Sequence, residues 1–413
     1  METLGRLMQN NTLLSVSVAR EKILQSISPL TSEICSIHSA HNRIVAEDLT
    51  ALISHPAQAV SAMDGYAARF SDIVTVPTLL PKVGTSRAGC MYKKPLLAGE
   101  LVRIFTGAVI PDGCDTIILQ EDTEIAQGKV QINEQPKMGQ FIRKLGLDFL
   151  AGQKIITKLS QLTSRSCALI ALAGFSEVNV IKKPKIGILT SGDELVTPGQ
   201  FPKPGQLINS NNLLLSSLIR STGGEPFDFG ILPDKPGALI EKLTNSTDLD
   251  LIVTTGGASV GDHDFIAADI QNDPNTDLYF WKIAMRPGKP LLFGKFKNIP
   301  LLGLPGNPVS AGVCSVLFLT PIIKKFLGLN PNLSYSNALI TQDLTENDKR
   351  EDYLRATLFE NNEGIRYVTP ANIQDSSMLA ILNKADCLIQ RPAFAPKIKR
   401  GSVVSILNFP NLF

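Results

Sequence analysis

The chain has 413 residues, of which 44% are hydrophobic and 19% are charged, and its formal net charge is +2. This length exceeds what a single hydrophobic core supports, and the near-neutral charge argues against a nucleic-acid-binding surface, which would carry a basic excess. The six cysteines are widely spaced, which favours free thiols over disulfides or a zinc site, and we find no signal peptide, so we expect a cytoplasmic protein of several domains.

The N-terminal part of the chain combines helical and β-rich patterns. Apolar residues at helical spacing predict amphipathic helices over residues 17–27 and 160–172. Short apolar runs interrupted by glycine and proline predict a small β-domain over residues 49–142, with strands at 73–76, 101–105, 116–119 and 129–132. Helical segments flank this block. We therefore expect the β-domain to be inserted into a helical region, formed by residues 1–48 and 143–180, that provides a subunit contact.

From residue 185 the sequence alternates between strands and helices. Strands are predicted at 185–189, 226–232, 251–255 and 278–283, and helices at 211–221, 236–244, 264–271 and 308–327. This order is typical of an α/β domain with a mainly parallel sheet, here residues 181–329, whose ligand site lies outside the carboxyl ends of the strands. The apolar run at 311–323 is too short for a membrane span and is interrupted by Pro321, so we expect no span and no membrane partner.

The last part of the chain, residues 330–413, follows a linker marked by Pro331. Strand patterns at 353–359, 387–390 and 403–407 predict a small β-barrel or sandwich. The expected fold class is thus a multidomain α/β plus β protein.

A glycine loop after the third predicted strand of the α/β domain indicates an anion site. The stretch LIVTTGGASVGDHDF at 251–265 places Gly256 and Gly257 between a buried strand and a helix. Glycine lets a phosphate approach the backbone, and N–H groups at a helix N-terminus face an anion. Asp262 and Asp264 end the loop, and carboxylates beside a phosphate require a divalent cation, usually Mg²⁺. The loop predicts a phosphorylated ligand with a metal, although a purely structural turn also explains it.

The other predicted strand-end loops have the same chemical character. They combine carboxylates, cations and glycine or proline turns: TSGDELVTPG at 190–199 with Asp193 and Glu194, Asp234 after the second strand, AMRPGKP at 284–290 with Arg286 and Lys289, and GLPGNPVSA at 303–311 with Asn307. Carboxylates hold a hard cation, while cations and N–H groups hold phosphate. We expect these groups to converge on one edge. Taken singly, the acids and Asn307 also fit helix or turn caps, and Arg286 fits a solvated cation.

Two further turns lie in the predicted β-domain. SAMDGYA at 61–67 contains Asp64-Gly65, which is typical of a β-turn, and Thr106 begins a second turn. Asp148 follows a basic stretch at 143–146. Nothing in their spacing links these residues to the α/β domain.

Six motifs together carry a family resemblance. They are SAMDGYA (61–67), RIFTGAVIPDGCD (103–115), TSGDEL (190–195), GGASVGDHD (256–264), MRPGKP (285–290) and GLPGNPVSA (303–311). In this order they resemble the molybdopterin molybdenumtransferases, that is, the bacterial MoeA proteins and the gephyrin E-domain. The resemblance covers nearly the whole chain. It implies a homodimer in which each chain has a helical dimerisation region with an inserted β-domain, an α/β molybdopterin-binding domain and a C-terminal β-barrel.

The resemblance also implies a reaction and a set of site residues. Such enzymes bind adenylylated molybdopterin, deliver molybdate to its dithiolene and release AMP with the help of Mg²⁺. The implied catalytic residues are Asp64, Thr106, Asp148, Glu194, Asp234 and Asp264, with Asp264 and Glu194 near Mg²⁺, and Asp64 and Thr106 reaching the site across the dimer interface. The implied binding residues are Thr190, Ser191, Gly192, Asp193, Gly256, Gly257, Ser259, Lys282, Arg286, Lys289, Pro305, Pro308, Arg355 and Ser376.

Some positions depart from the family pattern, and some alternatives stay open. Arg286 stands where members usually have lysine, Ala59-Val60 replaces an Asp-Asn pair, and Thr190-Ser191 replaces Ser-Thr. A molybdopterin adenylyltransferase is one alternative, but such proteins lack the 61–67 motif and the barrel. A non-catalytic pterin-binding scaffold and a tungstate-specific insertase are the others. The adenylyltransferase is also a possible partner that delivers the pterin.

Overall fold

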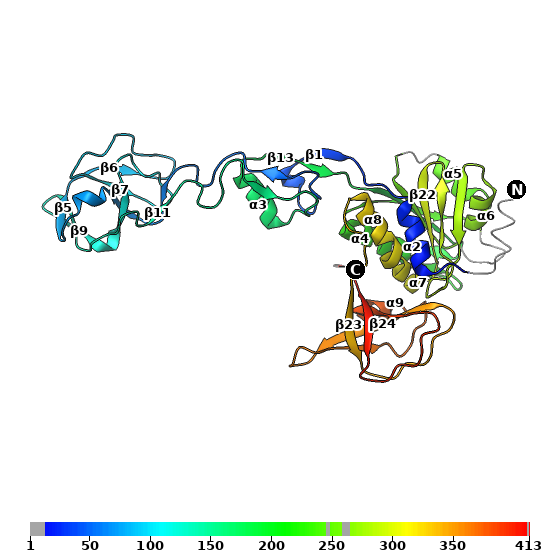
Figure 1. Cartoon of the computed structure of the whole chain (residues 1–413). Coiled ribbons are helices and arrows are strands. Elements are labelled where there is room, and N and C mark those ends of the chain that lie inside the picture. The colour runs from blue at the N-terminus through cyan, green and yellow to red at the C-terminus, as the bar shows by residue number, and fades with distance from the viewer. Residues whose placement is uncertain (1–12, 245–247, 258–264, 411–412) are drawn as a thin grey trace. The chain divides into compact units, whose positions relative to one another are not determined.

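The computed structural model describes residues 13–244, 248–257, 265–410 and 413, and the chain forms two compact units (Figure 1). Unit 1 consists of the segment up to Ser32 together with Ile181–Phe413, and unit 2 is Glu33–Val180. The more finely divided boundaries expected from the sequence, at residues 48, 142, 180 and 329, stay a prediction.

A six-stranded sheet in the order β17-β14-β18-β22-β21-β19 forms the centre of the α/β part of unit 1. The strands are β14 (Lys185–Ser191), β17 (Glu225–Leu232), β18 (Leu251–Thr255), β19 (Thr276–Trp281), β21 (Leu292–Phe296) and β22 (Ile299–Leu304). The first four in the sheet order are parallel, whereas β21 runs antiparallel to both of its neighbours. Every residue of β18 is buried, as expected for a central strand covered on both faces. The sequence prediction missed β21 and β22.

The helices of the α/β part are α4 (Asn211–Thr222), α5 (Ala238–Thr244) and α6 (Phe265–Asn272), close to their predicted ranges. Helix α4 ends at Gly223, whose φ of 101° is the left-handed C-cap conformation that glycine adopts without strain. At the start of α5, the Asp269 carboxylate accepts hydrogen bonds from the N–H groups of Gly237 (2.7 Å) and Leu239 (3.3 Å). Because Asp269 caps α5, the sequence-based alternative that Asp234 serves as this cap was wrong.

The segments α7 (Pro308–Cys314), the π-helix η4 (Ser315–Leu319) and α8 (Thr320–Phe326) are consecutive and form one apolar helix. It has the length and hydropathy of a membrane span, but 89% of that window is buried inside the protein, as in the core helix of a globular domain. The expectation that Pro321 interrupts this run was wrong. The π-helical turn before Pro321 changes the backbone hydrogen-bond pattern, which accommodates the missing proline N–H.

The N-terminal helix α2 (Val16–Gln25) belongs to unit 1. The sequence prediction had instead grouped it, as part of region 1–48, with the segments that flank the β-domain. Helix α2 packs against η4 and α8, and Figure 1 shows it beside α8. Its buried residues Val16, Ala19 and Ile23 recur at helical spacing, which explains the amphipathic signal.

The C-terminal part of unit 1 is a closed barrel. Strands β24 (Glu351–Glu360), β25 (Arg366–Pro370), β23 (Tyr335–Ile340), β27 (Val403–Asn408) and β26 (Cys387–Arg391) pair in this order, and β26 pairs back with β24. The short strand β20 (Met285–Arg286) pairs with β24 in parallel. The segment after β19 therefore connects the α/β part to the barrel.

Unit 2 contains a four-stranded sheet and a three-stranded sheet. The first has the order β6 (Lys82–Ser86), β7 (Leu101–Ile104), β4 (Gly65–Ala68) and β8 (Thr116–Leu119), and the second has the order β5 (Thr78–Leu80), β10 (Lys129–Ile132) and β9 (Thr123–Ala126). The predicted strand at 73–76 was wrong, because Pro77, which lacks an N–H, follows it and the strand begins only at Thr78.

The segments of unit 2 that flank these sheets are less helical than predicted. They contain the helix α3 (Ser164–Leu172) and the two-stranded ribbons β1 (Ser32–Ser36) with β13 (Glu177–Ile181), β2 (Leu49–Thr50) with β12 (Lys154–Ile156), and β3 (Val60–Ser61) with β11 (Ile142–Arg143).

The core of the α/β part predicts the effect of a truncation. Leu301 in β22 is 1% exposed within an apolar cluster that Trp281 contacts, whereas Leu213 on α4 is 63% exposed. We expect Leu301→Ala to lower the free energy of unfolding of unit 1 by about 2–5 kcal/mol, since it leaves a cavity, and Leu213→Ala by less than about 1 kcal/mol. Urea unfolding followed by the fluorescence of the single tryptophan measures both, and equal losses would contradict the packing described.

Candidate functional site

A cavity of about 890 Å³ lies in unit 1 at the carboxyl ends of β14, β18 and β22. Its lining comes from these strand ends, from the first residues of α4 and α7, from the segment 285–290, and from a barrel loop at 374–377. This is the edge at which ligands of open α/β sheets bind. The convergence of strand-end loops is as expected from the sequence pattern, whereas the contribution of the barrel was implied only by the family resemblance, through Ser376.

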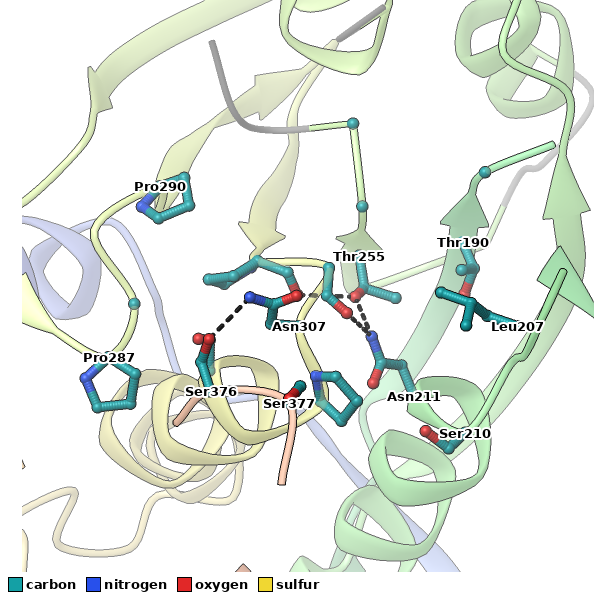
Figure 2. Close-up of a pocket in the computed structure, with 18 of the residues that line it drawn as sticks. Thr190, Leu207, Ser210, Asn211, Thr255, Pro287, Pro290, Asn307, Ser376 and Ser377 are labelled. Atoms are coloured by element: carbon teal, nitrogen blue, oxygen red, sulfur yellow. Dashed lines mark hydrogen bonds between the residues drawn. The ribbon is translucent and has the colours of Figure 1, made fainter. Parts of the chain in front are cut away.

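Asn211, at the start of α4, ties three parts of the cavity wall together. Its Nδ2 donates to Thr255 Oγ1 (2.9 Å) and to the carbonyl oxygen of Gly306 (2.7 Å), and Thr255 Oγ1 donates to the carbonyl oxygen of Pro305 (3.0 Å) (Figure 2). The Asn211 Oδ1 atom is buried and has no hydrogen-bond partner in the described part of the chain. Buried acceptors are normally satisfied, so a bound ligand or water is the expected partner.

Glycines bring the loop backbones into direct contact at the sheet edge. Gly256 has a φ of 83°, and a Cβ on it would lie 2.4 Å from the carbonyl oxygen of Ser191. A Cβ on Gly306 would lie 3.3 Å from the Cα of Gly256. A side chain at Gly256 would therefore both strain the backbone and overlap the neighbouring strand. The close approach leaves a backbone surface on which an anion can be bound.

Carboxylates link the loops that follow β14 and β17. Asp234 accepts a hydrogen bond from Ser191 Oγ and a second from the N–H of Asp193 (3.3 Å). The N–H of Asp234 donates in return to Asp193 Oδ1 (3.0 Å). Glu194 and Asp234 line the cavity, whereas Asp193 is exposed and is not part of the lining. Two acidic groups thus face the cavity from adjacent strands.

Arg286 is held by the barrel and is not the solvated cation of the sequence-based alternative. Its Nη1 lies 3.3 Å from Asp348 Oδ2, its Nη2 donates to Asn347 Oδ1 (3.3 Å), and Nη2 also pairs with Asp352 Oδ2. The hydrogen bond to Asp352 raises the pKa of Arg286, so its charge is permanent, while burial raises the pKa of Asp352. A fixed positive charge therefore stands in the cavity wall.

Asn307 also connects the cavity to the barrel. It occupies the N-cap position of α7, but its side chain makes no capping hydrogen bond. Its Nδ2 instead donates to Ser376 Oγ (2.8 Å), as Figure 2 shows. The capping role considered for Asn307 was therefore wrong, because the side chain is engaged by the barrel loop.

Most of the residues that the sequence assigned to binding line this one cavity, although their roles stay a prediction. The lining includes Thr190, Ser191, Gly192, Glu194, Asp234, Gly256, Gly257, Arg286, Lys289, Pro305, Pro308 and Ser376. Ser259, Asp262 and Asp264 lie outside the described residues. Asp64, Thr106 and Asp148 belong to unit 2, whereas this cavity is built from unit 1 alone.

Lys282 and Arg355 do not line the cavity. The Lys282 ammonium lies 4.0 Å from the centroid of the Trp281 ring, a cation–π contact. Arg355 is buried in the barrel, where its Nη2 donates to the carbonyl oxygen of Asp375 (3.0 Å) in the loop that does line the cavity. Burial lowers the pKa of Arg355. Arg355 therefore supports the wall from behind.

Asp64 and Thr106 form a local pair in unit 2. Asp64 Oδ1 accepts hydrogen bonds from the N–H (2.7 Å) and the Oγ1 (2.8 Å) of Thr106. These bonds lower the pKa of Asp64, and the charge of Arg103 adds to the effect. Asp64 is exposed, so it presents a stable carboxylate to whatever meets this surface.

A magnesium site made of protein groups alone is not found: within the described residues, no cluster of three histidine, cysteine, aspartate or glutamate side chains is placed to hold a metal ion. Mg²⁺ is commonly bound by one or two carboxylates together with substrate phosphates and water. Glu194 at the cavity wall fits that second mode.

Sequence reasoning missed Asn211, Thr255 and, apart from Ser376, which the family resemblance implied, the barrel loop 374–377. The polar run NSN at 209–211, at the start of a predicted helix, was a usable signal for Asn211. Thr255 is the last residue of a buried strand, so its sequence pattern indicates a core residue and not a residue of the site. The loop 374–377 is distant in sequence, and only the tertiary packing brings it to the cavity.

The glycine contact predicts a difference between two matched substitutions. Gly199→Ala places a Cβ in open space at a φ of 95°, and it should cost about 1–2 kcal/mol in the free energy of unfolding from backbone strain alone. Gly256→Ala adds the overlap with Ser191, so its loss should be clearly larger. Urea unfolding followed by Trp281 fluorescence compares them. Equal losses would show that the loops do not approach as closely as described.

Comparisons with protein-family models cover most of the chain. The MoeA N-terminal region (domain I and II) matches residues 14–174, a probable molybdopterin binding domain matches residues 187–325, and the MoeA C-terminal region (domain IV) matches residues 337–409.

Similar proteins match over nearly their full length. The molybdopterin molybdenumtransferase of Haemophilus influenzae is 35% identical, with 97% of this chain and 100% of that protein covered. The protein of the same name from Nostoc is 33% identical over 92% of this chain and 89% of its own length. The crystal structure of a molybdopterin biosynthesis MoeA protein from Pyrococcus horikosii covers 97% of this chain and 100% of its own, with a TM-score of 0.81 and 29% identity. The chain therefore belongs to the MoeA family of molybdopterin molybdenumtransferases.

Proposed function

We propose that the chain inserts molybdate into adenylylated molybdopterin and releases AMP, as a late step of molybdenum cofactor synthesis. The observation that carries this proposal is the cavity of about 890 Å³ in which glycine backbones, carboxylates and cations meet at the carboxyl edge of the sheet. A nucleotide joined to a phosphorylated pterin needs such a mixture, because its phosphates, heterocycles and incoming oxyanion differ in charge. The family membership supports the same reaction.

The residues would divide the substrate between them. The Gly256 and Gly257 backbone, with Ser259, would hold the phosphates, and Asn211 Oδ1 would accept an N–H of a heterocycle. Arg286 and Lys289 would attract molybdate, a dianion, from the side that carries Ser376. Lys282 and Arg355, which do not line the cavity, would act at longer range or by supporting the wall.

Mg²⁺ would be held by Glu194 and Asp264 together with substrate phosphate oxygens. When bound it would supply charge withdrawal from the phosphoanhydride, which makes AMP a better leaving group. The carboxylate of Glu194 at the cavity wall supports this assignment. Asp234 would hold the Ser191 side chain and the backbone of Asp193 in place through its two hydrogen bonds.

The active form would be a homodimer in which unit 2 of a second copy completes the cavity. Asp64 would then face the substrate as a carboxylate held by Thr106, and Asp148 belongs to the same unit. The low pKa of Asp64 supports a role that needs a charged group throughout the physiological pH range. A molybdopterin adenylyltransferase is the class of enzyme that must supply the adenylylated substrate, and we propose it as a transient partner in the cytoplasm.

The direct test is release of AMP from adenylylated molybdopterin under anaerobic conditions, with molybdate and Mg²⁺ present. We expect Mg²⁺-dependent AMP release, together with a product that reconstitutes a molybdoenzyme. Glu194→Gln should slow AMP release by about 10- to 1,000-fold if it positions the metal and the leaving group. Glu225→Gln makes the same charge change at the amino end of β17 and should leave the rate unchanged. A normal rate in Glu194→Gln would remove Glu194 from the site.

Mixing two inactive variants tests whether the site is shared between copies. In a dimer with twofold symmetry, randomly mixed Asp64→Asn and Glu194→Gln chains form heterodimers in about half of the cases, each with one intact site, so about a quarter of wild-type activity should return. If Asp64 and Glu194 served the same copy, both sites of every heterodimer would be defective and no activity would return. The two unmixed variants are the controls.

A further inference from the structure

Asp352 of β24 lies between two arginines, each of which is its direct neighbour on an adjacent strand. The sheet register pairs it with Arg286 of β20 on one side and with Arg391 of β26 on the other. Residues directly opposite on neighbouring strands have side chains on the same face and within interaction range. One carboxylate therefore has two guanidinium groups near it.

The carboxylate is shared unevenly between these two groups. Asp352 Oδ2 pairs with Arg286, whereas Oδ1 is buried and, within the described structure, has no hydrogen-bond partner. Arg391 also has a buried atom without a hydrogen-bond partner among the described residues. Its Nη2 donates to three backbone carbonyl groups, at 2.8 to 3.4 Å, but its buried Nη1 has no acceptor among the described residues. A bond between Asp352 and Arg391 Nη1 would satisfy both of these atoms, and unsatisfied buried charged atoms are costly.

A second cavity, of about 380 Å³, gives these side chains room to change partners. Arg286, Asp352, Gln374 and Arg391 are all part of its lining. Arg286 and Gln374 also line the larger cavity, so Arg286 stands at the boundary between the two. Asp352 and Arg391 are 5% and 3% exposed, whereas nearly half of the Arg286 side chain is exposed. A move of Asp352 toward Arg391 would therefore take a negative charge away from the larger cavity.

We propose that Asp352 is a latch on Arg286 and that Arg391 is the alternative partner that releases it. Without an oxyanion, Asp352 holds Arg286. When a tetrahedral oxyanion such as molybdate binds the Arg286 guanidinium in the larger cavity, Asp352 pairs with Arg391 Nη1. The exchange leaves every charge paired, so it avoids the cost of stranding a buried carboxylate. Asp352 and Arg391 are thus positioning residues, and the inference rests on the proposed function because it takes the oxyanion as substrate.

Arginine suits this position better than a lysine would. A guanidinium has five N–H donors on three nitrogens, so it can exchange one carboxylate for an oxyanion while Asp348 still contacts another nitrogen. A lysine ammonium has one nitrogen, so binding an oxyanion would displace its contacts with both carboxylates. The latch is therefore a property of this chain's own residues.

Molybdate affinity, measured by isothermal titration calorimetry, tests the latch through a double-mutant cycle. Asp352→Asn removes the competing charge and should tighten molybdate binding by about tenfold, whereas Arg391→Gln leaves Asp352 without its alternative and should weaken binding by about tenfold. In the Asp352→Asn background, Arg391→Gln should have no further effect. Asp348→Asn is the matched control on the exposed side, and it should change the affinity by less than about threefold.

Additive effects of the two substitutions, or an unchanged affinity in Asp352→Asn, would overturn the proposal. Steady-state kinetics separates it from a general structural role: the KM for molybdate should move with the affinity, whereas the KM for adenylylated molybdopterin should not. Thermal melting checks the fold of each variant. If Arg391→Gln does not fold, Arg391→Lys replaces it, and the same weakening is expected because a single nitrogen cannot serve both the carbonyl groups and Asp352.

A second readout needs no substrate, so it distinguishes failure of the latch from failure of the proposed function. Phenylglyoxal modifies accessible arginines, and mass spectrometry gives the labelling rate at Arg286. We expect Asp352→Asn to label several-fold faster than wild type, while Asp348→Asn labels at nearly the wild-type rate. Equal rates in wild type and Asp352→Asn would overturn the latch. Faster labelling without any molybdate binding to the wild-type chain would instead keep the latch and reject molybdate as the ligand.

Discussion

The site depends on the close approach of three backbone segments at the carboxyl edge of the parallel sheet. Gly256 touches the end of β14 at Ser191 and the turn after β22 at Gly306, and Asn211 fixes this arrangement with two hydrogen bonds. Because backbone and buried polar groups form the contact, few side chains can change there without either a steric overlap or an unsatisfied donor. The remaining wall, which comes from the carboxylate loops and the barrel, is arranged around this contact.

Much of the fold could be predicted from the sequence, because buried strands and helices have strong local hydrophobic patterns. Leu251–Thr255 was predicted with its observed bounds since all five residues are buried and β-branched or leucine. The strands β21 and β22 were missed because the pair is joined by a tight turn at 297–298, so their apolar residues did not separate into two runs. Helix α2 was assigned to the wrong region because its amphipathic pattern shows that it packs, but not against what.

The site residues could be predicted where polar loops follow the strands of the parallel sheet. They could not be predicted where a distant part of the chain, the barrel, contributes to the cavity wall. Glu194, Asp234 and the glycines follow strands, so the parallel topology alone places them at one edge. Ser376 and the loop around it come from the barrel, where no local pattern indicates the α/β domain. Arg286 is the instructive case: its sequence position gave the charge, but its contacts with Asp348 and Asp352 depend on the pairing of β20 with β24.

The barrel contributes to the cavity at the carboxyl edge of the α/β sheet. It supplies the loop 374–377 to the cavity wall and holds the cation that we propose meets molybdate. A crystal structure of the chain with AMP bound tests the central claim most directly. We expect the phosphate of AMP on the backbone at Gly256 and Gly257, in the cavity whose wall Asn211 fixes. AMP bound at any other place on unit 1, with this cavity left open, would contradict it.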